Sequence, residues 1–239
     1  MATWIVHLRL AERLLEHIDG LDAAAFALGN IAPDSGIPDA AWEKFNPPPE
    51  LTHFMAGSGD DLADLDFYRL HLSGIAAGEA ETARYSFRLG YFCHLATDNL
   101  WSHLVGRPTQ ARFAAEFAAN PKFVWVVKED WYGLDFIYVR DHPESLFWRV
   151  FLGIEVTQSY LDFLPLDALQ QRVAYIKEYY QKKDEWVQQA YRRPYIYLSQ
   201  AEMDGFVETA SMRLLRIYQC LKTDPTVMNG LKSSLQIIC

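Results

Sequence analysis

Residues 89–104 read LGYFCHLATDNLWSHL, an apolar segment that three polar side chains interrupt. The apolar residues recur every three to four positions, which is the period of an α-helix. Residues four apart stack on one helix face, so His94 and Asp98 present an imidazole and a carboxylate to a single point. His103 follows nine positions after His94, which places it about 180° away around a straight helix. The segment therefore predicts a buried helix with a polar pair on one face.

The same helical period runs along most of the 239-residue chain, and the alternation typical of β-strands is hard to find. Half of the residues are hydrophobic, which is enough for a sizeable core, and no repeat or linker divides the chain. We therefore expect an all-α fold, a single-domain multi-helix bundle over residues 1–239. The expected helices cover residues 4–17, 22–30, 60–77, 79–105, 108–119, 123–140, 143–163, 166–191 and 199–221, with a short one at the end. Between them, residues 31–53 form a long, proline-containing irregular loop, and loops of this length are usually functional.

The overall charge and the N-terminal pattern limit the possible partners and locations. The formal net charge is -9 and no run of Lys or Arg exceeds two residues, so there is no clear nucleic-acid surface. No segment approaches the roughly 20 apolar residues of a membrane span, and polar residues break the first helix in a way that export signals do not. The cysteines, Cys93, Cys220 and Cys239, lack pair or metal-ribbon spacing, which favours reduced thiols. We expect a cytoplasmic protein, and the sequence does not specify its oligomeric state.

Three further polar residues occupy unusual settings. His7 interrupts the amphipathic segment WIVHLRLAERLL, Asp34 follows a proline in GNIAPD, and His53 closes the irregular loop. Each has a structural alternative, since a core histidine can bond to a carbonyl group and an aspartate can cap a turn. With His94 and Asp98 they make a set of three imidazoles and two carboxylates, which suits zinc or another divalent transition metal.

The order of these motifs resembles a known family. The segments HLRLAERLL (7–15), FALGNIAPD (26–34), HF (53–54) and LGYFCHLATDNLW (89–101) follow one another as in the zinc-dependent phospholipase C family, which is related to the fungal zinc single-strand nucleases. The resemblance covers roughly residues 1–105. It implies an all-α fold of that type, with up to three zinc ions at the bottom of a cleft, and hydrolysis of phosphate esters.

The resemblance also implies roles for the individual residues. One zinc site would take four ligands, which are Asp34, His53, His94 and Asp98. Asp98 resembles the carboxylate that bridges to a second site, which His7 would share. Asp34 resembles the residue that orients or deprotonates the attacking water and is the expected catalytic residue.

The remaining site of the family matches less completely. His103 and Asp130 are the expected ligands there, but the family has a histidine four residues before the carboxylate, where this chain has Val126. The secreted relatives also use the freed amine of a terminal tryptophan, and Trp4 lies three residues inside this chain. We therefore expect between one and three divalent ions, most simply zinc, with one or two favoured.

The sequence thus predicts a metal-dependent phosphoesterase or phosphodiesterase that acts on a small phosphoester or a phospholipid head group. A bound divalent ion lowers the pKa of its water to near neutrality and neutralises phosphoryl charge. A membrane substrate needs an apolar rim and a nucleotide needs a stacking slot, and the same aromatic residues could form either. These residues are Trp42, Phe45, Phe54 and Trp131.

Two other interpretations stay open. In the first, a structural metal fastens the loop 31–53 to the helical core and the protein is a non-catalytic binding module; structural sites are closed to water, whereas catalytic sites keep an open position. In the second, the His and Asp residues are buried pairs in a helical protein that binds no metal. An HD-type metal phosphohydrolase is disfavoured, because the chain has no adjacent His-Asp dipeptide.

Overall fold

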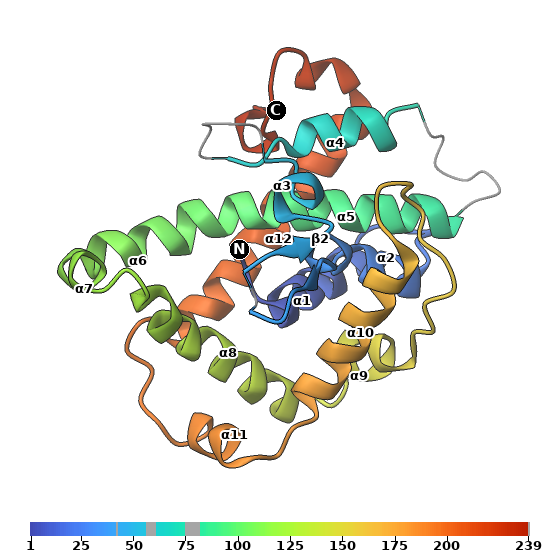
Figure 1. Ribbon diagram of the computed structural model, residues 1–239. Helices are drawn as coiled ribbons and strands as arrows, with labels where there is room; N and C mark the ends of the chain where they lie inside the picture. Colours follow the sequence, from blue (N-terminus) through green and yellow to red (C-terminus); the bar gives the residue numbers. More distant parts are fainter. Residues whose placement is uncertain (42, 56–60, 75–81, 239) are drawn as a thin grey trace.

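The computed structural model describes residues 1–41, 43–55, 61–74 and 82–238, and its regular secondary structure is almost entirely helical (Figure 1). The predicted all-α fold is confirmed. The longer helices are α1 (Trp4–Leu15), α2 (Ala23–Gly29), α4 (Asp64–His71), α5 (Thr82–Trp101), α8 (Phe123–Asp141), α10 (Leu166–Tyr180) and α12 (Gln200–Thr223). The short ones are α3 (Pro49–Thr52), α6 (Arg107–Arg112), α7 (Ala114–Ala119), α9 (Leu146–Arg149) and α11 (Glu185–Ala190). Single turns are η1 (Ala32–Asp34), η2 (Ser102–Gly106, a π-helical turn), η3 (Phe151–Gly153), η4 (Pro225–Met228) and η5 (Ser234–Gln236).

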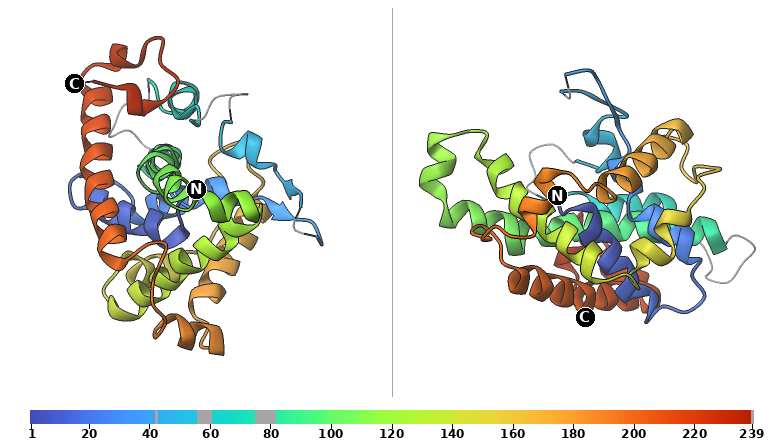
Figure 2. Two further views of the ribbon diagram at one scale, coloured as in Figure 1. Left: turned by 90° about the vertical axis from the view of Figure 1, so that its left-hand side faces the viewer. Right: turned by 90° about the horizontal axis from the view of Figure 1, so that it is seen from below.

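Helix α5 is the central element of the fold. Every residue from Leu89 to Trp101 is buried, as expected of a helix that other elements surround on all sides. In the left view of Figure 2, α5 is seen end-on, with α12 on one side and the loop 31–53 on the other. The polar pair on α5 therefore lies inside the protein and not on its surface.

Two glycines allow α2 and α5 to approach each other closely. A Cβ atom added at Gly90 would lie 2.3 Å from the carbonyl oxygen of Phe26, and one added at Gly29 would lie 2.0 Å from the carbonyl oxygen of Phe87. Both contacts are with backbone atoms, which cannot move aside as a flexible side chain can. Any side chain here would force the two helices apart.

We therefore expect Gly90→Ala to lower the free energy of unfolding by about 3 kcal/mol, the upper range for overpacking a core. The matched control is Gly205→Ala in α12, where an added Cβ atom meets nothing within 4 Å. That substitution is expected to raise the free energy of unfolding by roughly 0.5–1 kcal/mol, because alanine favours the helix. Urea denaturation of both variants measures the difference, and equal stabilities would contradict the close contact.

The structure corrects three of the expected helices, and one of them, residues 108–119, is divided into α6 and α7 at Phe113. Residues 143–163 are not one helix, because α9 and η3 are followed by extended chain from Ile154, where a glycine and β-branched residues disfavour a helix. Residues 166–191 are divided into α10 and α11, because the Asp184 carboxylate accepts a hydrogen bond from the Val187 N–H and so begins a new helix. The expected helices at 60–77 and 79–105 extend partly outside the described residues.

The loop 31–53 is more ordered than expected from its prolines. It contains η1, a two-residue antiparallel pair of strands and α3. The strands are β1 (Ile37–Pro38) and β2 (Phe45–Asn46), and Ile37 pairs with Asn46. These elements give both ends of the loop a defined position against the helical core.

Two further predictions concern the cysteines and the membrane. Cys93 is free and buried, but Cys220 is disulfide-bonded, so the prediction of reduced thiols is wrong for Cys220. Spacing along the chain misled here, because a disulfide depends on distance in the fold. Among the described residues, no helix is long and apolar enough to span a membrane.

Candidate metal centre

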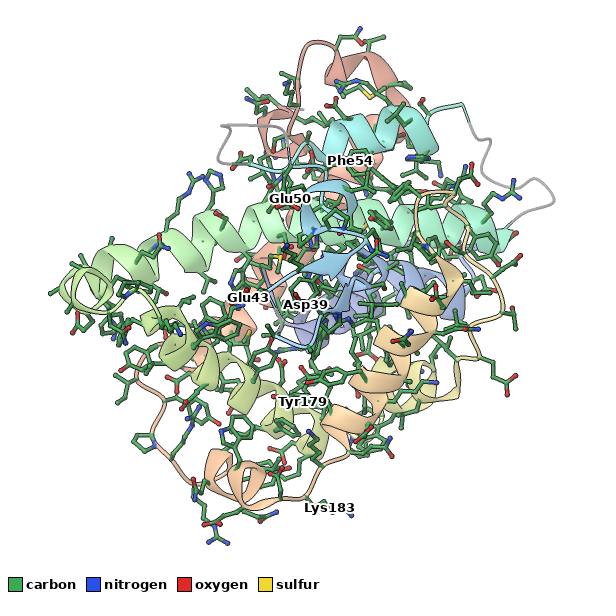
Figure 3. The ribbon with its side chains drawn as sticks, in the orientation of Figure 1. Asp39, Glu43, Glu50, Phe54, Tyr179 and Lys183 are labelled. Atoms are coloured by element: carbon green, nitrogen blue, oxygen red, sulfur yellow. The ribbon has the colours of Figure 1, made fainter. Side chains whose placement is uncertain are left out.

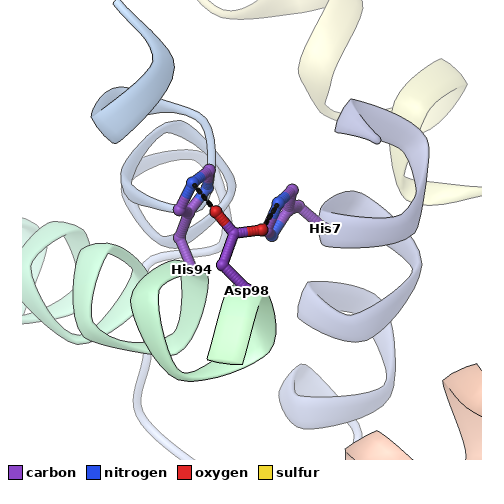
Figure 4. A group of neighbouring side chains, drawn as sticks. All are labelled: His7, His94 and Asp98. Carbon is purple, nitrogen blue, oxygen red and sulfur yellow. Dashed lines mark ion pairs between the residues drawn. The ribbon is translucent and has the colours of Figure 1, made fainter. Parts of the chain in front are cut away.

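The first part of the centre joins α5 to α1. The Nε2 atom of His94 lies 3.5 Å from Oδ2 of Asp98, as the four-residue spacing predicts. The Nε2 atom of His7, from α1, lies 3.5 Å from Oδ1 of the same carboxylate. Figure 4 shows Asp98 between the two imidazoles, one on each of its oxygens. The rings of His7 and His94 stack with their centroids 3.8 Å apart.

The second part comes from the loop 31–53. The Nε2 atom of His53 lies 3.3 Å from Oδ1 of Asp34 and 3.8 Å from Oδ2 of Asp98. Asp34 lies at the end of η1, and His53 directly follows α3. The structure therefore brings together all five residues of the first two predicted sites.

Their ligand atoms form two overlapping groups, in each of which all atoms lie within 4.8 Å of one another. One group is His7, His94 and Asp98, and the other is Asp34, His53 and His94. Several of these atoms are buried without any hydrogen-bond partner, namely Nε2 of His7, Nε2 of His53, Nε2 of His94 and Oδ2 of Asp98. Burying unsatisfied polar atoms costs free energy, and divalent ions bound at the cluster would satisfy them. The donor set therefore fits zinc.

Hydrogen bonds to neighbouring groups fix the orientation of three of the ligand side chains. The Nδ1–H of His94 donates to the carbonyl oxygen of Asn30 at 2.8 Å, which leaves Nε2 with its lone pair toward the cluster. The Nδ1 atom of His53 lies 3.0 Å from the Thr52 hydroxyl. The indole N–H of Trp4 donates to Oδ2 of Asp34 at 2.9 Å.

The geometry also limits the number of ions. His94 has one free nitrogen, and one nitrogen binds one metal, so the two groups cannot both use it. His94 and His53 lie nearest Oδ2 of Asp98, whereas His7 lies nearest Oδ1. The Oδ2 side of Asp98 therefore offers more ligands for an ion than the Oδ1 side, where His7 is the one imidazole among the described residues. A second ion on the Oδ1 side would be bound more weakly. The Ala2 backbone N–H also donates to Oδ1, at 2.7 Å.

Burial and mutual contact set the charge states of the cluster. Burial, with the nearby His94, lowers the pKa of His7 to about 4, so this imidazole is neutral at pH 7 and offers a lone pair. Burial alone would raise the pKa of Asp34, but the His53 imidazole beside it and the nearby His94 hold it well below its usual range. Neutral imidazoles and ionised carboxylates are the forms in which both residue types bind metals.

Two predicted ligands lie apart from this cluster. The His103 ring is in the π-helical turn η2, with Nε2 2.7 Å from Oδ1 of Asp61, and 38% of its side chain is exposed. The Asp130 carboxylate is buried and accepts the backbone N–H groups of Ile196 and Tyr197 at 2.8 and 2.7 Å. Neither belongs to a ligand group within the described part of the chain. We therefore leave both out of the proposed ligand set.

A cavity of about 340 Å³ lies beside Asp34 and His53, the two residues of the centre that come from the loop 31–53. Its wall includes Asp34 and His53, side chains of α8 and α10, and residues of the loop. In Figure 3, Tyr179 of α10 lies below the hairpin that carries Asp39 and Glu43. The side chain of Asp34 is 13% exposed, so this carboxylate belongs to the cluster and faces the cavity as well.

Aromatic side chains make up much of the cavity wall, but few of those expected from the sequence. Phe45 lines it, whereas Trp131 is buried against Trp101 and Phe54 packs against Phe67. Trp42 lies outside the described residues. The cavity is also lined by Tyr132, and the aromatic residues of the wall that sequence reasoning missed are Trp4, Trp125, Tyr175 and Tyr179.

The missed polar residues of the wall are Lys128 of α8 and Arg172 of α10. Lys128 stands in the aromatic segment FVWVVKEDWY, and a charge in such a helix was the available signal. Arg172 had no comparable signal, because its place in the cavity depends on how α10 packs.

The comparisons with known proteins agree with the geometry. No curated protein and no solved structure matches the chain. The model of the family described as zinc dependent phospholipase C matches residues 6–204, which include His7, Asp34, His53, His94 and Asp98. The chain therefore belongs to the zinc dependent phospholipase C family.

Proposed function

We propose that the protein is a zinc-dependent phosphoesterase that hydrolyses a small phosphoester or phosphodiester in the cavity beside the metal centre. The observation that carries the proposal is the position of Asp34, which lies 3.3 Å from His53 in the cluster and also lines the cavity. A ligand group that opens onto a cavity leaves room for water and substrate, as a catalytic site requires. Family membership supports a hydrolase of phosphoesters.

Zinc and the side chains of the protein would each supply a part of the hydrolysis. When bound, zinc lowers the pKa of a coordinated water and neutralises charge on a phosphoryl oxygen. The carboxylate of Asp34 orients the attacking water and accepts its proton. The indole N–H of Trp4, on Oδ2, keeps that carboxylate aimed at the cavity. When bound, the ion would be held by Asp34, His53, His94 and Asp98, and His7 lies on the second carboxylate oxygen of Asp98.

A panel of chromogenic phosphomonoesters and phosphodiesters, run with zinc, manganese and nickel in turn, tests the proposal. We expect hydrolysis of at least one ester, loss of the activity with a chelator, and recovery when zinc is returned. Protein that binds zinc stoichiometrically but hydrolyses none of the esters would contradict the proposed function.

The alternative is a structural metal that fastens the loop 31–53 to the core. The observation that favours it is that Asp34 and His53 come from the two ends of this loop. In that case chelation unfolds the protein, and there is no hydrolase activity to lose. Circular dichroism during chelation, followed beside the ester panel, separates the two functions.

The proposal also covers the substrate class, the cellular location and the domain organisation. The substrate class extends to phospholipid head groups, since the family is named for phospholipase C. The cytoplasmic location stays a prediction from the N-terminal pattern, and the disulfide bond at Cys220 weighs against it, because disulfides persist in oxidising compartments. The family match ends within α12, so the assignment of residues 1–239 to one domain also stays a prediction.

A further inference from the structure

Lys128 is a half-buried cation in the wall of the cavity. It lies on α8, and its Nζ atom is 5.0 Å from the ring centroid of Trp125, with which it makes a cation–π contact. Among the described residues, no carboxylate lies within 4.0 Å of its ammonium group. Removing an ammonium group from water without an ion partner costs free energy. An anion that enters the cavity would offset that cost by pairing with the ammonium group.

Lys128 lines the same cavity as Asp34 of the metal centre. The negative charges of Asp34 and Asp98 act on its ammonium group and raise its pKa, although burial outweighs them and lowers the pKa overall. Both carboxylates belong to the proposed ligand set. When they bind a divalent ion their charge is largely neutralised, and Lys128 then has still less negative charge near it.

The second cation of the cavity is already engaged. Arg172 is buried, and its Nη2 atom donates to the carbonyl oxygen of Gly36 at 3.0 Å. Its guanidinium lies 5.5 Å from the ring centroid of Trp4 and 5.8 Å from that of Tyr175. Arg172 therefore fixes the loop and adds positive charge to the cavity, but its side chain is less free than that of Lys128 to follow a ligand.

Lys128 and Arg172 line the same cavity as Asp34. The charged residues that line the described part of the cavity are Asp34, Lys128 and Arg172, so the side chains there carry more positive than negative charge even before an ion binds. The protein as a whole has a net charge of -9. A local excess of positive charge on an acidic protein is suited to select an anion.

We propose that Lys128 is the phosphate-binding residue of this cavity and holds a non-bridging phosphoryl oxygen of a phosphate ester whose organic group packs on the aromatic wall. This inference rests on the proposed function, for which it supplies the substrate class: an ester with an anionic phosphate and an apolar or aromatic group. Tyr175 and Tyr179 of α10 form part of that wall, and their rings stack with centroids 5.9 Å apart. A flat or apolar group fits such a surface better than a highly charged one.

The test measures the binding of inorganic phosphate to the zinc-loaded full-length protein by calorimetry. Lys128→Met removes the charge and keeps the apolar stem, and we expect it to weaken phosphate binding about 10- to 100-fold, the value of a charge-assisted hydrogen bond. Lys128→Arg keeps the charge and should bind phosphate within a few-fold of wild type. Lys122→Met, on the exposed start of the same helix, changes the net charge equally and should have no effect.

A second measurement needs no variant and so does not depend on folding. Acetylation of the wild-type lysines is followed by mass spectrometry with and without phosphate, and phosphate should slow the acetylation of Lys128 but not that of Lys122. Unchanged phosphate affinity in Lys128→Met, or no protection of Lys128, overturns the inference. Loss of zinc from both Lys128 variants also overturns it, because the lysine then acts through the metal centre.

The ester panel run on the same proteins keeps the two proposals separate. Hydrolysis by wild type with an unaffected Lys128→Met variant removes this inference and leaves the proposed function. Phosphate binding that depends on Lys128, in a protein that hydrolyses no ester, removes the proposed function and leaves the anion site.

Discussion

His94→Ala is expected to purify without bound zinc and without phosphoesterase activity. His94 is the residue that both ligand groups share, and its Nε2 atom makes no hydrogen bond that would compete with a metal. Loss of a residue that only hydrogen-bonds to a metal ligand costs about 10- to 100-fold in metal affinity. Loss of the ligand itself should therefore cost more than about 100-fold. The metal content by mass spectrometry and the rise of Tm with added zinc measure the effect, since a ligand stabilises only the folded state that binds it.

His103→Ala is the matched control for this result. It removes the same side chain from the continuation of the same helix, where the ring is paired with Asp61 and lies outside both ligand groups. We expect it to keep the wild-type zinc content and Tm shift. If His94→Ala keeps its zinc, or if His103→Ala loses zinc to the same extent, the proposed ligand set is wrong.

Asp34→Asn is expected to lower kcat by about 10²- to 10⁴-fold, the usual contribution of a general base. An amide cannot accept the proton of the attacking water, but its oxygen can still face the metal. Zinc content measured at saturating metal should therefore fall much less than kcat. Steady-state kinetics with the best ester of the panel, beside metal analysis of the same samples, gives both quantities.

Trp4→Phe provides the comparison for Asp34. It keeps an aromatic ring in the wall, although a smaller one, and removes the indole N–H that bonds to Oδ2 of Asp34. Because Asp34 itself remains, we expect a smaller loss of kcat, about 10-fold, the value of one hydrogen bond to a charged group. An Asp34→Asn enzyme with wild-type kcat would show that another group handles the proton.

The fold class was predictable because its signal is local. The period of three to four residues marks the helices, and the buried central helix is visible in the run from Leu89 to Trp101. The errors lie where the same apolar spacing does not produce a helix. At 154–165, buried residues such as Leu161 and Leu164 belong to irregular chain, and side chains that pack from a loop leave a similar pattern.

The five clustered ligands were predictable as a set from the spacing within one helix and from the order of the family motifs. The positions of His103 and Asp130 were not. A π-helical turn follows α5 and pairs His103 with Asp61, and Asp130 satisfies backbone groups of residues 196 and 197, far along the chain. Such contacts depend on long-range packing, which periodicity does not report. The same reason hides Arg172, whose carbonyl partner Gly36 is 136 residues away.

Binding of a catalytic zinc ion by the cluster around His94 can be tested by an anomalous difference map at the zinc absorption edge from zinc-grown crystals. We expect a strong peak about 2.0–2.1 Å from Nε2 of His94, close to His53, Asp34 and Asp98. A zinc-saturated crystal with no peak in this cluster, or with its peak at His103 and Asp61, would contradict this expectation.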